Sequence, residues 1–485
     1  MRYRFLGEWR EQLWFINPNF CGAFIAVTTC LAIALFFYLL SSKRPRYLRL
    51  VSIPVALLII FLQVILAQTY SRGGYVALTA GIVVFAFLTK KWRSLIFLPI
   101  FFVVLLFTAK GVARVGTIAD ISEGSIFNRL LLWRGGACVI ADHWWSGVGS
   151  SFEAGILYTR WYQPLWLNTA YGTLLNDLLN IAAAWGVPCT LGLLLLFAYI
   201  FRGGWRICRS RESTLFAGAL AGLTSYIVAS FFTTMYHSPT MNITLAVLWF
   251  TILFYIAGAT IFKKVQWSLR DLLIPAAGVL AFGIVGTIAC FAVRATFPYT
   301  YKLDNGICTA TPRGESSGTV IICVGNKDFM TPAVRTIARP LMENGYTICL
   351  FIADNEHTGL REAEEKIALI TSDRAGQPYY IFADGLGGKQ AFIAGVKAQE
   401  LIKGMVLRNI PLEGQTNELA PTTYFADITT GVLVLNDTSH RKYLGSEADE
   451  IIEQLERHSR PYTVETISSP EEMVTAVSKF LRQSE

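Results

Sequence analysis

Arginine and aromatic side chains gather in one polar interval, residues 110–177, which separates two groups of hydrophobic segments. The interval holds five of the chain's twelve tryptophans, and its central part reads Asn128-Arg129-Leu-Leu-Leu-Trp133-Arg134. Aromatic rings stack on the faces of sugars, and the planar guanidinium group of arginine binds phosphate oxygens in pairs. These residue types therefore indicate a site for a glycan or a phosphorylated substrate.

The same interval has a second interpretation. Tryptophan and tyrosine also collect where an amphipathic hairpin lies in the membrane–water interface. Five Lys/Arg in the interval are balanced by five Asp/Glu, so its net charge favours neither interpretation. Composition alone leaves both open.

Composition and charge divide the chain into two parts. Its 485 residues are 53% hydrophobic with a mean hydropathy of +0.45, which is typical of a membrane protein. Residues 1–296 hold 24 Lys/Arg and 9 Asp/Glu, whereas residues 297–485 hold 18 and 25. We expect a membrane part joined near residue 297 to a water-exposed part. The nine cysteines form no CxxC pair and there are five histidines, so we expect no metal and no cofactor, and nucleic acid is not an expected partner.

Hydrophobicity predicts a polytopic α-helical membrane protein, because eight apolar segments are long enough, or nearly so, to cross a bilayer. They lie near residues 20–40, 48–69, 74–89, 92–109, 178–201, 214–234, 240–262 and 272–296. Three or four Lys/Arg occur in each of the connections 41–49, 90–93, 202–211 and 263–270. The positive-inside rule places these basic connections in the cytoplasm, so the interval 110–177 and the short turns at 70–73 and 235–240 are expected outside.

Two residues of the outer turns could take part in chemistry. Arg72 lies in Ser71-Arg72-Gly73-Gly74 at a helix end, where an arginine either snorkels to the lipid headgroups or meets an anion. His237 lies in the other short turn, and a single loop histidine is most often only solvated.

Taken together, these residues resemble the O-antigen ligase and polymerase family of bacterial envelope glycosyltransferases, over roughly residues 14–262. Four motifs carry the resemblance in the family's order: Asn17-Pro18-Asn19; Ser71-Arg72-Gly73; Arg129 and Trp133 with Asp142-His143, Gly147-Val-Gly149 and Phe152; and Asn176-Asp177 with Gly186. The resemblance implies a GT-C-like membrane domain over residues 1–296, with the interval 110–177 as its outer loop.

The resemblance also implies an activity. The donor would be a glycan on undecaprenyl diphosphate, transferred without a metal to a sugar hydroxyl of a glycan or lipid A-core acceptor. This would take place at the periplasmic face of the bacterial inner membrane, among membrane lipids and envelope-assembly proteins. Arg72 and Arg129 match the family's essential arginines, which would stabilise charge on the departing diphosphate. Substrate contacts are expected from Ser71, Trp133, Arg134, Tyr171 and Asn176.

One position departs from the family. Its members usually carry histidine directly before the Asn-Asp pair, to take the acceptor's proton or to orient the acceptor, and this chain has Leu175 there. Leucine can neither accept a proton nor donate a hydrogen bond. Tyr171, Asp177 or His237 could substitute, or nothing does, which would leave a glycan-binding relative without transferase activity. Between His237 and Asp177, His237 is slightly favoured as the substitute.

Beyond residue 317 the pattern changes to short strands alternating with helices, after an expected linker at 297–316. Strands are predicted at 319–324, 346–352, 379–382, 403–407 and 431–435, in a parallel sheet. The order resembles the α/β-hydrolase fold over residues 317–485, which we expect outside the cytoplasm.

The nucleophile position of that fold is altered here. The elbow should read Gly-x-Ser-x-Gly-Gly and instead reads Ala383-Asp384-Gly385-Leu386-Gly387-Gly388, so that Gly385 replaces the serine. No histidine occurs in Val464–Pro470, where the resemblance places the catalytic one. We therefore expect a pseudo-hydrolase.

Three functions remain possible from the sequence. The first is an inner-membrane glycosyltransferase of ligase or polymerase type for lipopolysaccharide or another envelope polysaccharide. The second is a catalytically inactive glycan-binding scaffold in polysaccharide export. The third is a membrane-tethered hydrolase, against which Gly385 argues.

Overall fold

The computed structural model describes residues 2–5, 8–11, 15, 17–41, 45–108, 124–164, 167, 171–210, 213–261, 269–325, 333–353, 356–373, 377–413, 417–437 and 447–484. The chain divides into two compact units, Met1–Arg294 and Ala295–Glu485.

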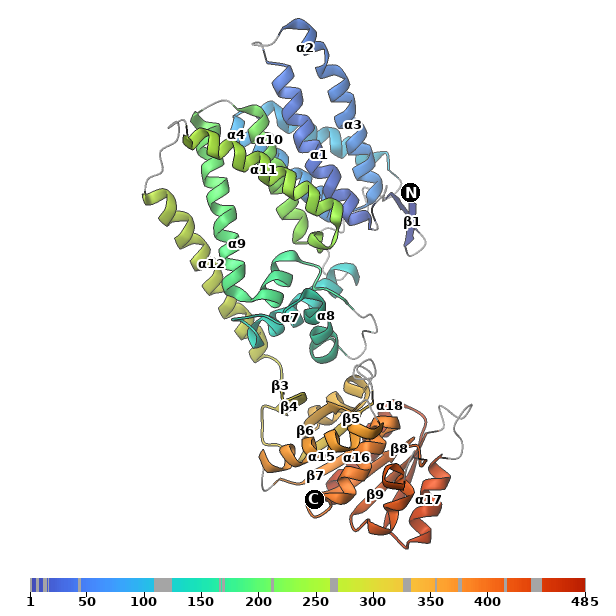
Figure 1. Ribbon diagram of the computed structural model, residues 1–485. Coiled ribbons are helices and arrows are strands. Elements are labelled where there is room, and N and C mark those ends of the chain that lie inside the picture. Colours follow the sequence, from blue (N-terminus) through green and yellow to red (C-terminus); the bar gives the residue numbers. More distant parts are fainter. Residues whose placement is uncertain are drawn as a thin grey trace. The chain divides into compact units, whose positions relative to one another are not determined.

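Apolar helices build the first unit (Figure 1). After a hairpin of β1 (Arg2–Phe5) and β2 (Glu8–Glu11) come α1 (Pro18–Leu39), α2 (Arg46–Leu50), α3 (Ser52–Thr69), α4 (Arg72–Thr89), η1 (Trp92–Ile96), α5 (Phe97–Leu106), α9 (Asp177–Ser210), α10 (Thr214–Ser230), α11 (Pro239–Ile261) and α12 (Leu269–Ala295). Over the described residues, five helical segments are long and apolar enough to cross a membrane, and three shorter ones are also apolar. All eight segments predicted from hydrophobicity are therefore helical, as expected for a multi-pass membrane protein.

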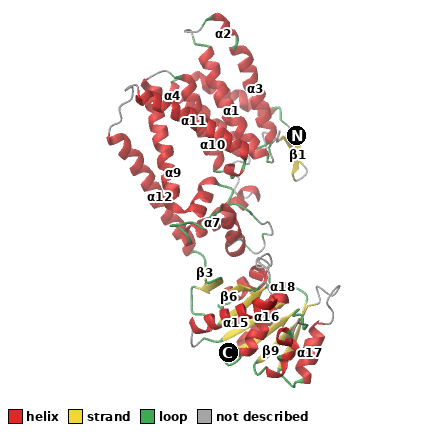
Figure 2. Cartoon of the chain, viewed as in Figure 1, coloured by secondary structure: helices red, strands yellow, loops and turns green. Residues whose placement is uncertain are grey.

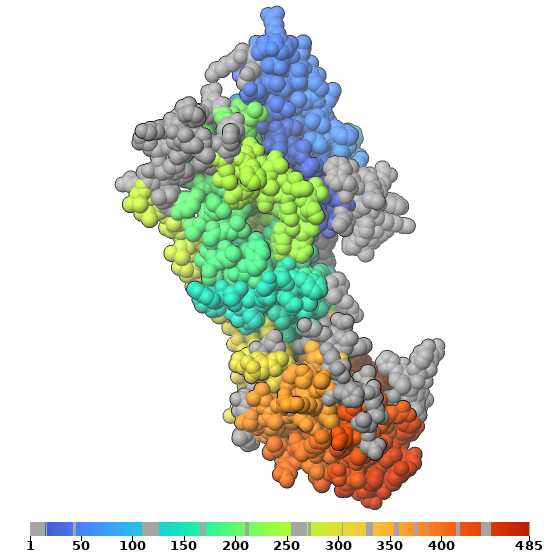
Figure 3. Space-filling model, viewed as in Figure 1, coloured from blue at the N-terminus to red at the C-terminus, as the bar shows by residue number. Residues whose placement is uncertain are grey.

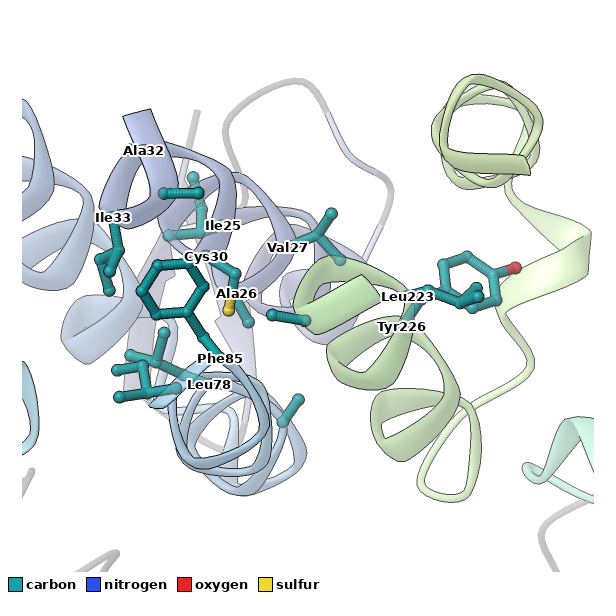
Figure 4. Close-up of a cluster of buried hydrophobic side chains, with 14 of the residues drawn as sticks. Ile25, Ala26, Val27, Cys30, Ala32, Ile33, Leu78, Phe85, Leu223 and Tyr226 are labelled. Carbon is teal, nitrogen blue, oxygen red and sulfur yellow. The ribbon is translucent and has the colours of Figure 1, made fainter. Parts of the chain in front are cut away.

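Small residues let α1, α4 and α10 pack closely at the centre of this unit (Figure 4). A Cβ atom added to Gly218 on α10 would lie 2.2 Å from the Cβ of Ala34 on α1. Ser225 Oγ on α10 donates to the Ala77 carbonyl on α4 at 2.9 Å, and lies 3.3 Å from Cys30 Sγ on α1. Close contact of this kind replaces hydrophobic driving force between membrane helices. The contacts of Ser225 with Ala77 and Cys30 fix the position of α10 relative to α4 and α1.

The interval between α5 and α9 is largely helical over its described part. It contains α7 (Gly124–Asp142), α8 (Ser151–Leu157) and the π-helical turn η2 (Tyr158–Tyr162), which lie at the lower end of the first unit in the space-filling view (Figure 3). Helix α9 then bends at Gly186, whose φ of 83° and ψ of 165° are not helical. The bend separates a short segment, 177–185, from the longer remainder.

The second unit is an eight-stranded sheet covered by helices (Figure 2). Its strands are β3 (Tyr299–Asp304), β4 (Ile307–Pro312), β5 (Thr319–Val324), β6 (Thr347–Ile352), β7 (Tyr379–Asp384), β8 (Ile402–Arg408), β9 (Gly431–Asp437) and β10 (Tyr462–Ile467). Its main helices are η5 (Val334–Ala338), α14 (Arg339–Glu343), α15 (Glu356–Asp373), α16 (Gly385–Lys397), α17 (Glu447–Arg457) and α18 (Pro470–Ser484). The spatial order is β10-β9-β8-β7-β5-β6-β4-β3. β4 pairs antiparallel with both β3 and β6, and the other neighbouring strands pair parallel.

Two sequence predictions need correction here. The expected linker at 297–316 instead forms the hairpin of β3 and β4, which extends the sheet, and the sheet is accordingly mixed rather than parallel. The turn between the two strands is Asn305-Gly306, with positive φ at both residues (49° and 72°). Asn-Gly between alternating apolar residues is a strong hairpin signal, so the sequence held the information. The five predicted strands are confirmed.

Candidate functional site

Arg72 is the first residue of α4, in a turn that packs against the end of α10. The hydroxyl of Ser71 caps the helix by accepting a hydrogen bond from the Gly74 N–H at 3.2 Å. A Cβ atom added to Gly73 would lie 2.9 Å from Phe232 Cβ. The half-buried Arg72 therefore projects from a turn whose backbone is fixed on both sides.

Asn176 ties the start of α9 to the same end of α10. Its Oδ1 accepts from the Leu179 N–H at 3.1 Å, as a helix cap does, and its Nδ2 donates to the Phe231 carbonyl at 3.2 Å. Phe231 and Phe232 thus contact Asn176 and the Arg72 turn, respectively. The motifs around Arg72 and Asn176, about one hundred residues apart in sequence, therefore contact two consecutive residues at the end of α10.

Asp177 is buried beside η3 (Met235–His237), with 7% of its surface exposed. The backbone N–H groups of Met235 and Tyr236 approach its carboxylate as donors. Its Oδ1 has no hydrogen-bond partner within the described residues. A buried carboxylate oxygen without a donor is costly unless a ligand or water supplies one.

Hydroxyl groups link the neighbouring segment to η3. Asn180 Nδ2 donates to Thr234 Oγ1 at 3.0 Å, and Thr234 Oγ1 lies 2.9 Å from Thr173 Oγ1. The Leu174 N–H in turn donates to Asn180 Oδ1 at 2.9 Å. This network fixes residues 173–180 against the turn that carries His237.

His237 lies in η3 and faces α8. Its Nε2 is 2.9 Å from the hydroxyl of Ser151, the first residue of α8, and the Tyr236 phenol also hydrogen-bonds to Ser151. Burial lowers the pKa of His237, which favours the neutral ring that can accept a proton. Burial, together with the nearby Asp177, raises the pKa of Tyr236. His237 and Asp177 therefore flank one neutral tyrosine.

Arg129, on α7, lies at the other end of the segment 171–177. The Tyr171 phenol hydrogen-bonds to the Asn128 side chain and lies close to the Arg129 guanidinium group. Burial raises the pKa of Tyr171, and Arg129 and Asn128 counter part of that rise. The segment 171–177 therefore connects Arg129 at its first residue with the Arg72 turn and Asp177 at its last residues.

The other two predicted substrate contacts lie on α7. Trp133 is one helical turn beyond Arg129, so the two side chains share a face, and its buried Nε1 has no acceptor among the described residues. Arg134 is exposed. The indole N–H is a donor available to a ligand oxygen.

Leu175, at the position of the family's histidine, has a left-handed backbone with φ of 50°. This conformation is uncommon for residues other than glycine, and histidine, asparagine and aspartate adopt it more readily than leucine does. The half-buried leucine thus occupies a strained position in the middle of the site.

The remaining motif residues hold the α7–α8 layer in place. Val148 N–H and Gly149 N–H donate to the Ala183 and Ala184 carbonyls at 2.9 and 2.8 Å, and Val187 N–H donates to the Trp144 carbonyl at 2.7 Å. Thus the Gly147–Gly149 turn sits in the bend of α9. Asp142 is anchored separately, since it accepts from Arg294 Nε on α12 at 2.8 Å and from the Tyr162 hydroxyl.

Several residues of this site were missed from sequence, namely Ser151, Asn180, Thr234, Tyr236 and Arg294. Only Ser151 and Tyr236 adjoin a predicted residue or motif. Within the described ranges, no group of three His, Cys, Asp or Glu side chains could hold a metal ion.

The elbow of the second unit keeps its backbone and lacks its nucleophile. Gly385 follows β7 with φ of 61°, and a Cβ atom added there would meet no atom within 4 Å. A Cβ atom on Gly387 would lie 2.2 Å from the Gly325 nitrogen, so the tight strand-to-helix bend still needs that glycine. Without an Oγ at Gly385 the elbow offers no nucleophile.

An ion-pair cluster occupies the strand ends beside this elbow. Arg408, which ends β8, donates to Asp384 Oδ2 at 3.4 Å and to Asp437 Oδ2 at 2.6 Å. The Asp437 side chain is 4% exposed and that of Arg408 is 16% exposed. Since Asp384, Arg408 and Asp437 end three adjacent strands, their pairing joins those strands at their carboxyl ends.

Comparisons with known proteins give a family match within the first unit and similar solved structures for the C-terminal part. An O-antigen ligase family model (Wzy_C) matches residues 58–194, a span that includes Arg72, Arg129, Asn176 and Asp177 but not His237. No curated protein matches the chain.

Solved structures resemble the C-terminal part. An esterase from Pyrococcus furiosus is 13% identical, covering 39% of this chain and 91% of its own, with a TM-score of 0.32. Est1E from Butyrivibrio proteoclasticus is 14% identical, covering 39% and 99%, with a TM-score of 0.30. At these values the resemblance says nothing about activity. The chain is thus a multi-pass membrane protein whose residues 58–194 match the model of the O-antigen ligase family, followed by a second unit built on a mixed sheet covered by helices.

Proposed function

We propose that this protein is a glycosyltransferase of the O-antigen ligase or polymerase type. It moves a glycan from an undecaprenyl-diphosphate donor to a sugar hydroxyl of a glycan or lipid A-core acceptor, at the periplasmic face of the inner membrane. The observation that carries the proposal is the segment 171–177, which joins Arg129, the Arg72 turn, Asp177 and the His237 turn into one polar cluster inside the matched family domain and next to it.

The roles follow from the chemistry of the leaving group. A diphosphate ester gains charge on its oxygens as the sugar–oxygen bond breaks, and fixed cationic donors stabilise that charge. Arg72 and Arg129 supply them from opposite ends of the segment. A neutral imidazole at His237 takes the proton of the attacking hydroxyl. Asn176 and Trp133 position the sugars.

The direct test is transfer by the purified chain in liposomes. A glycan on a lipid diphosphate and a hydroxyl acceptor are supplied, and we expect a lengthened or newly linked glycan together with release of lipid diphosphate. Release of the lipid diphosphate without transfer of the glycan to the acceptor would indicate hydrolysis instead. For the orientation, single cysteines at residues 317–485 should react with an impermeant reagent in spheroplasts, and those at 41–49 should not.

The second candidate is a glycan-binding scaffold without transferase activity, and Leu175 is the observation that favours it. If the site still transfers, Leu175→His should raise the rate, because imidazole suits the left-handed backbone better and adds a proton acceptor. Leu175→Asn is the matched control, since it suits the backbone without adding a base. Donor binding without transfer in the parent and in Leu175→His would favour the scaffold.

A further inference from the structure

A cavity lies in the membrane unit, away from the polar cluster. It is a cavity of about 500 Å³ between α4, α9 and α10, whose lining includes Phe87, Trp92, Phe201, Trp205, Ile227 and Val228. The one hydroxyl among its lining residues belongs to Thr224, and that group donates to the Leu220 carbonyl at 2.9 Å. The walls therefore offer a ligand only hydrocarbon and aromatic surface.

The cavity lies between helices that run in opposite directions. Helices α4 and α10 run in opposite directions, since Ser225 near the end of α10 meets Ala77 near the start of α4, while Lys91 Nζ donates to Thr214 Oγ1 at 2.7 Å at the other end. The lining reaches from Trp92, next to Lys91, to Val228 on α10. On α4 the lining residues run from Val83 to Leu88, about 8 Å along the helix at 1.5 Å per residue. The cavity therefore has room for a segment of an acyl chain.

One end of the cavity is strongly basic. Residues 83–93 and 201–206 include five Lys/Arg and no Asp or Glu: Lys90, Lys91, Arg93, Arg202 and Arg206. Trp92 and Trp205 line the cavity at this end, and each is followed directly by an arginine. Lys90 and Arg93 are exposed. Tryptophans beside basic residues mark the level of lipid headgroups.

We propose that this groove binds an anionic phospholipid, with one acyl chain between α4, α9 and α10 and the phosphate on the basic rim formed by Lys90, Arg93 and Arg206. The hydrocarbon walls require a chain, and the uniform positive charge selects an anionic headgroup. The rim follows the last residue of α4, while Arg72 begins that helix, which separates rim and polar cluster by about 27 Å at 1.5 Å per residue. The bound lipid is therefore distinct from a glycan donor at the polar cluster.

The test measures the unfolding temperature of the full-length protein in detergent, with phosphatidylglycerol or phosphatidylcholine of the same chains added. The parent should be stabilised by several degrees more with phosphatidylglycerol, because only a ligand that binds the folded state raises the midpoint. Inorganic phosphate alone should give no rise. Equal stabilisation by both lipids would overturn the proposal.

Matched variants separate chain from headgroup. Val84→Trp fills the groove and should abolish the rise with either lipid, while Val247→Trp, at a lipid-facing position on α11 that is 59% exposed, should behave as the parent does. Lys90→Gln with Arg93→Gln should abolish only the preference for phosphatidylglycerol. Arg46→Gln with Arg49→Gln on α2 should keep it. Loss of the preference in this last variant as well would mean general surface charge, and the site would be refuted even if Val84→Trp fails to fold.

Discussion

Each unit holds one polar cluster, at a place where several helix or strand ends meet. The two clusters differ in the groups that contact their basic side chains. In the second unit, Arg408 is bound by two carboxylates of the same chain at 2.6 and 3.4 Å. In the membrane unit, Arg129 lies beside the neutral phenol of Tyr171, and His237 is hydrogen-bonded to the hydroxyl of Ser151. The cation of the second unit is therefore held by charged partners, whereas the contacts described in the membrane unit are made through a phenol and a hydroxyl group.

The elbow of the second unit keeps the glycines that its bend requires, such as Gly387, while the position that would react is Gly385. The tight bend therefore depends on Gly387 for packing, whether or not position 385 carries a reacting group. The membrane cluster shows the reverse at Leu175, where a strained backbone persists around a side chain without polar atoms.

The largest expected effect tests the base of the membrane cluster. His237→Gln keeps a hydrogen-bonding group toward Ser151 but removes the base, so transfer should fall by about 10²–10⁴-fold. In the parent, the neutral imidazole is the active form, and activity should be full above its pKa and fall as pH drops through it. Because burial places that pKa below the ordinary value of about 6.5, the fall should come below pH 6.5. The pH profile of the transfer rate checks this.

Asp177 is the alternative base and supplies the contrasting variant. Asp177→Asn preserves size and the contacts with the N–H groups of Met235 and Tyr236. Full transfer in His237→Gln, combined with collapse in Asp177→Asn, would assign the base to Asp177 and remove His237 from the mechanism.

The two arginines should give the next largest effect. Arg72→Ala and Arg129→Ala should each lower transfer by about 10²–10³-fold, the usual result of removing one preorganised donor to developing charge. Lysine at either position should restore only part, since it cannot make a paired contact with phosphate oxygens. Arg46→Ala, in the exposed helix α2, is the control and should transfer as the parent does. Unchanged rates at equal expression in both site variants would show that the site lies elsewhere.

The ion-pair cluster of the second unit predicts an effect on stability instead. Arg408→Ala leaves Asp437 buried without its cation, which should cost about 3 kcal/mol. Cys323 is fully buried in this unit, so its reaction rate with a thiol reagent in mild denaturant measures the loss. Replacing Asp437 by asparagine as well should recover part of the stability, because both charges are then gone. Labelling of Cys323 at the parental rate in Arg408→Ala would contradict a structural role for the cluster.

The sequence predicted the secondary-structure elements better than the contacts between residues that are far apart in the chain. Hydrophobic runs located all eight membrane segments and the buried strands β5 to β9, because both bury long apolar stretches. The hairpin of β3 and β4 was missed because its apolar residues alternate with polar ones, although Asn305-Gly306 marked its turn. The contacts of Asn176 with Phe231 and of His237 with Ser151 join residues far apart in sequence. No local pattern encodes such pairs, so sequence alone gave the motif residues but not their partners.

The smallest effect is expected from restoring the missing serine of the elbow. Gly385→Ser fits sterically, since a Cβ atom there meets nothing within 4 Å, although the left-handed backbone should cost about 1–2 kcal/mol. A serine hydroxyl becomes a nucleophile only beside a base. The guanidinium group of Arg408 cannot accept a proton, and Asp384 and Asp437 are paired with it. After β10, where a catalytic histidine would be expected, Ser468 and Ser469 instead bond to Glu472 at the start of α18.

Gly385→Ser should therefore turn over no activated ester and form no fluorophosphonate adduct, with an active serine esterase as positive control. An adduct mapped to the introduced serine would mean that a base lies within its reach, and the elbow could then no longer be described as unable to react.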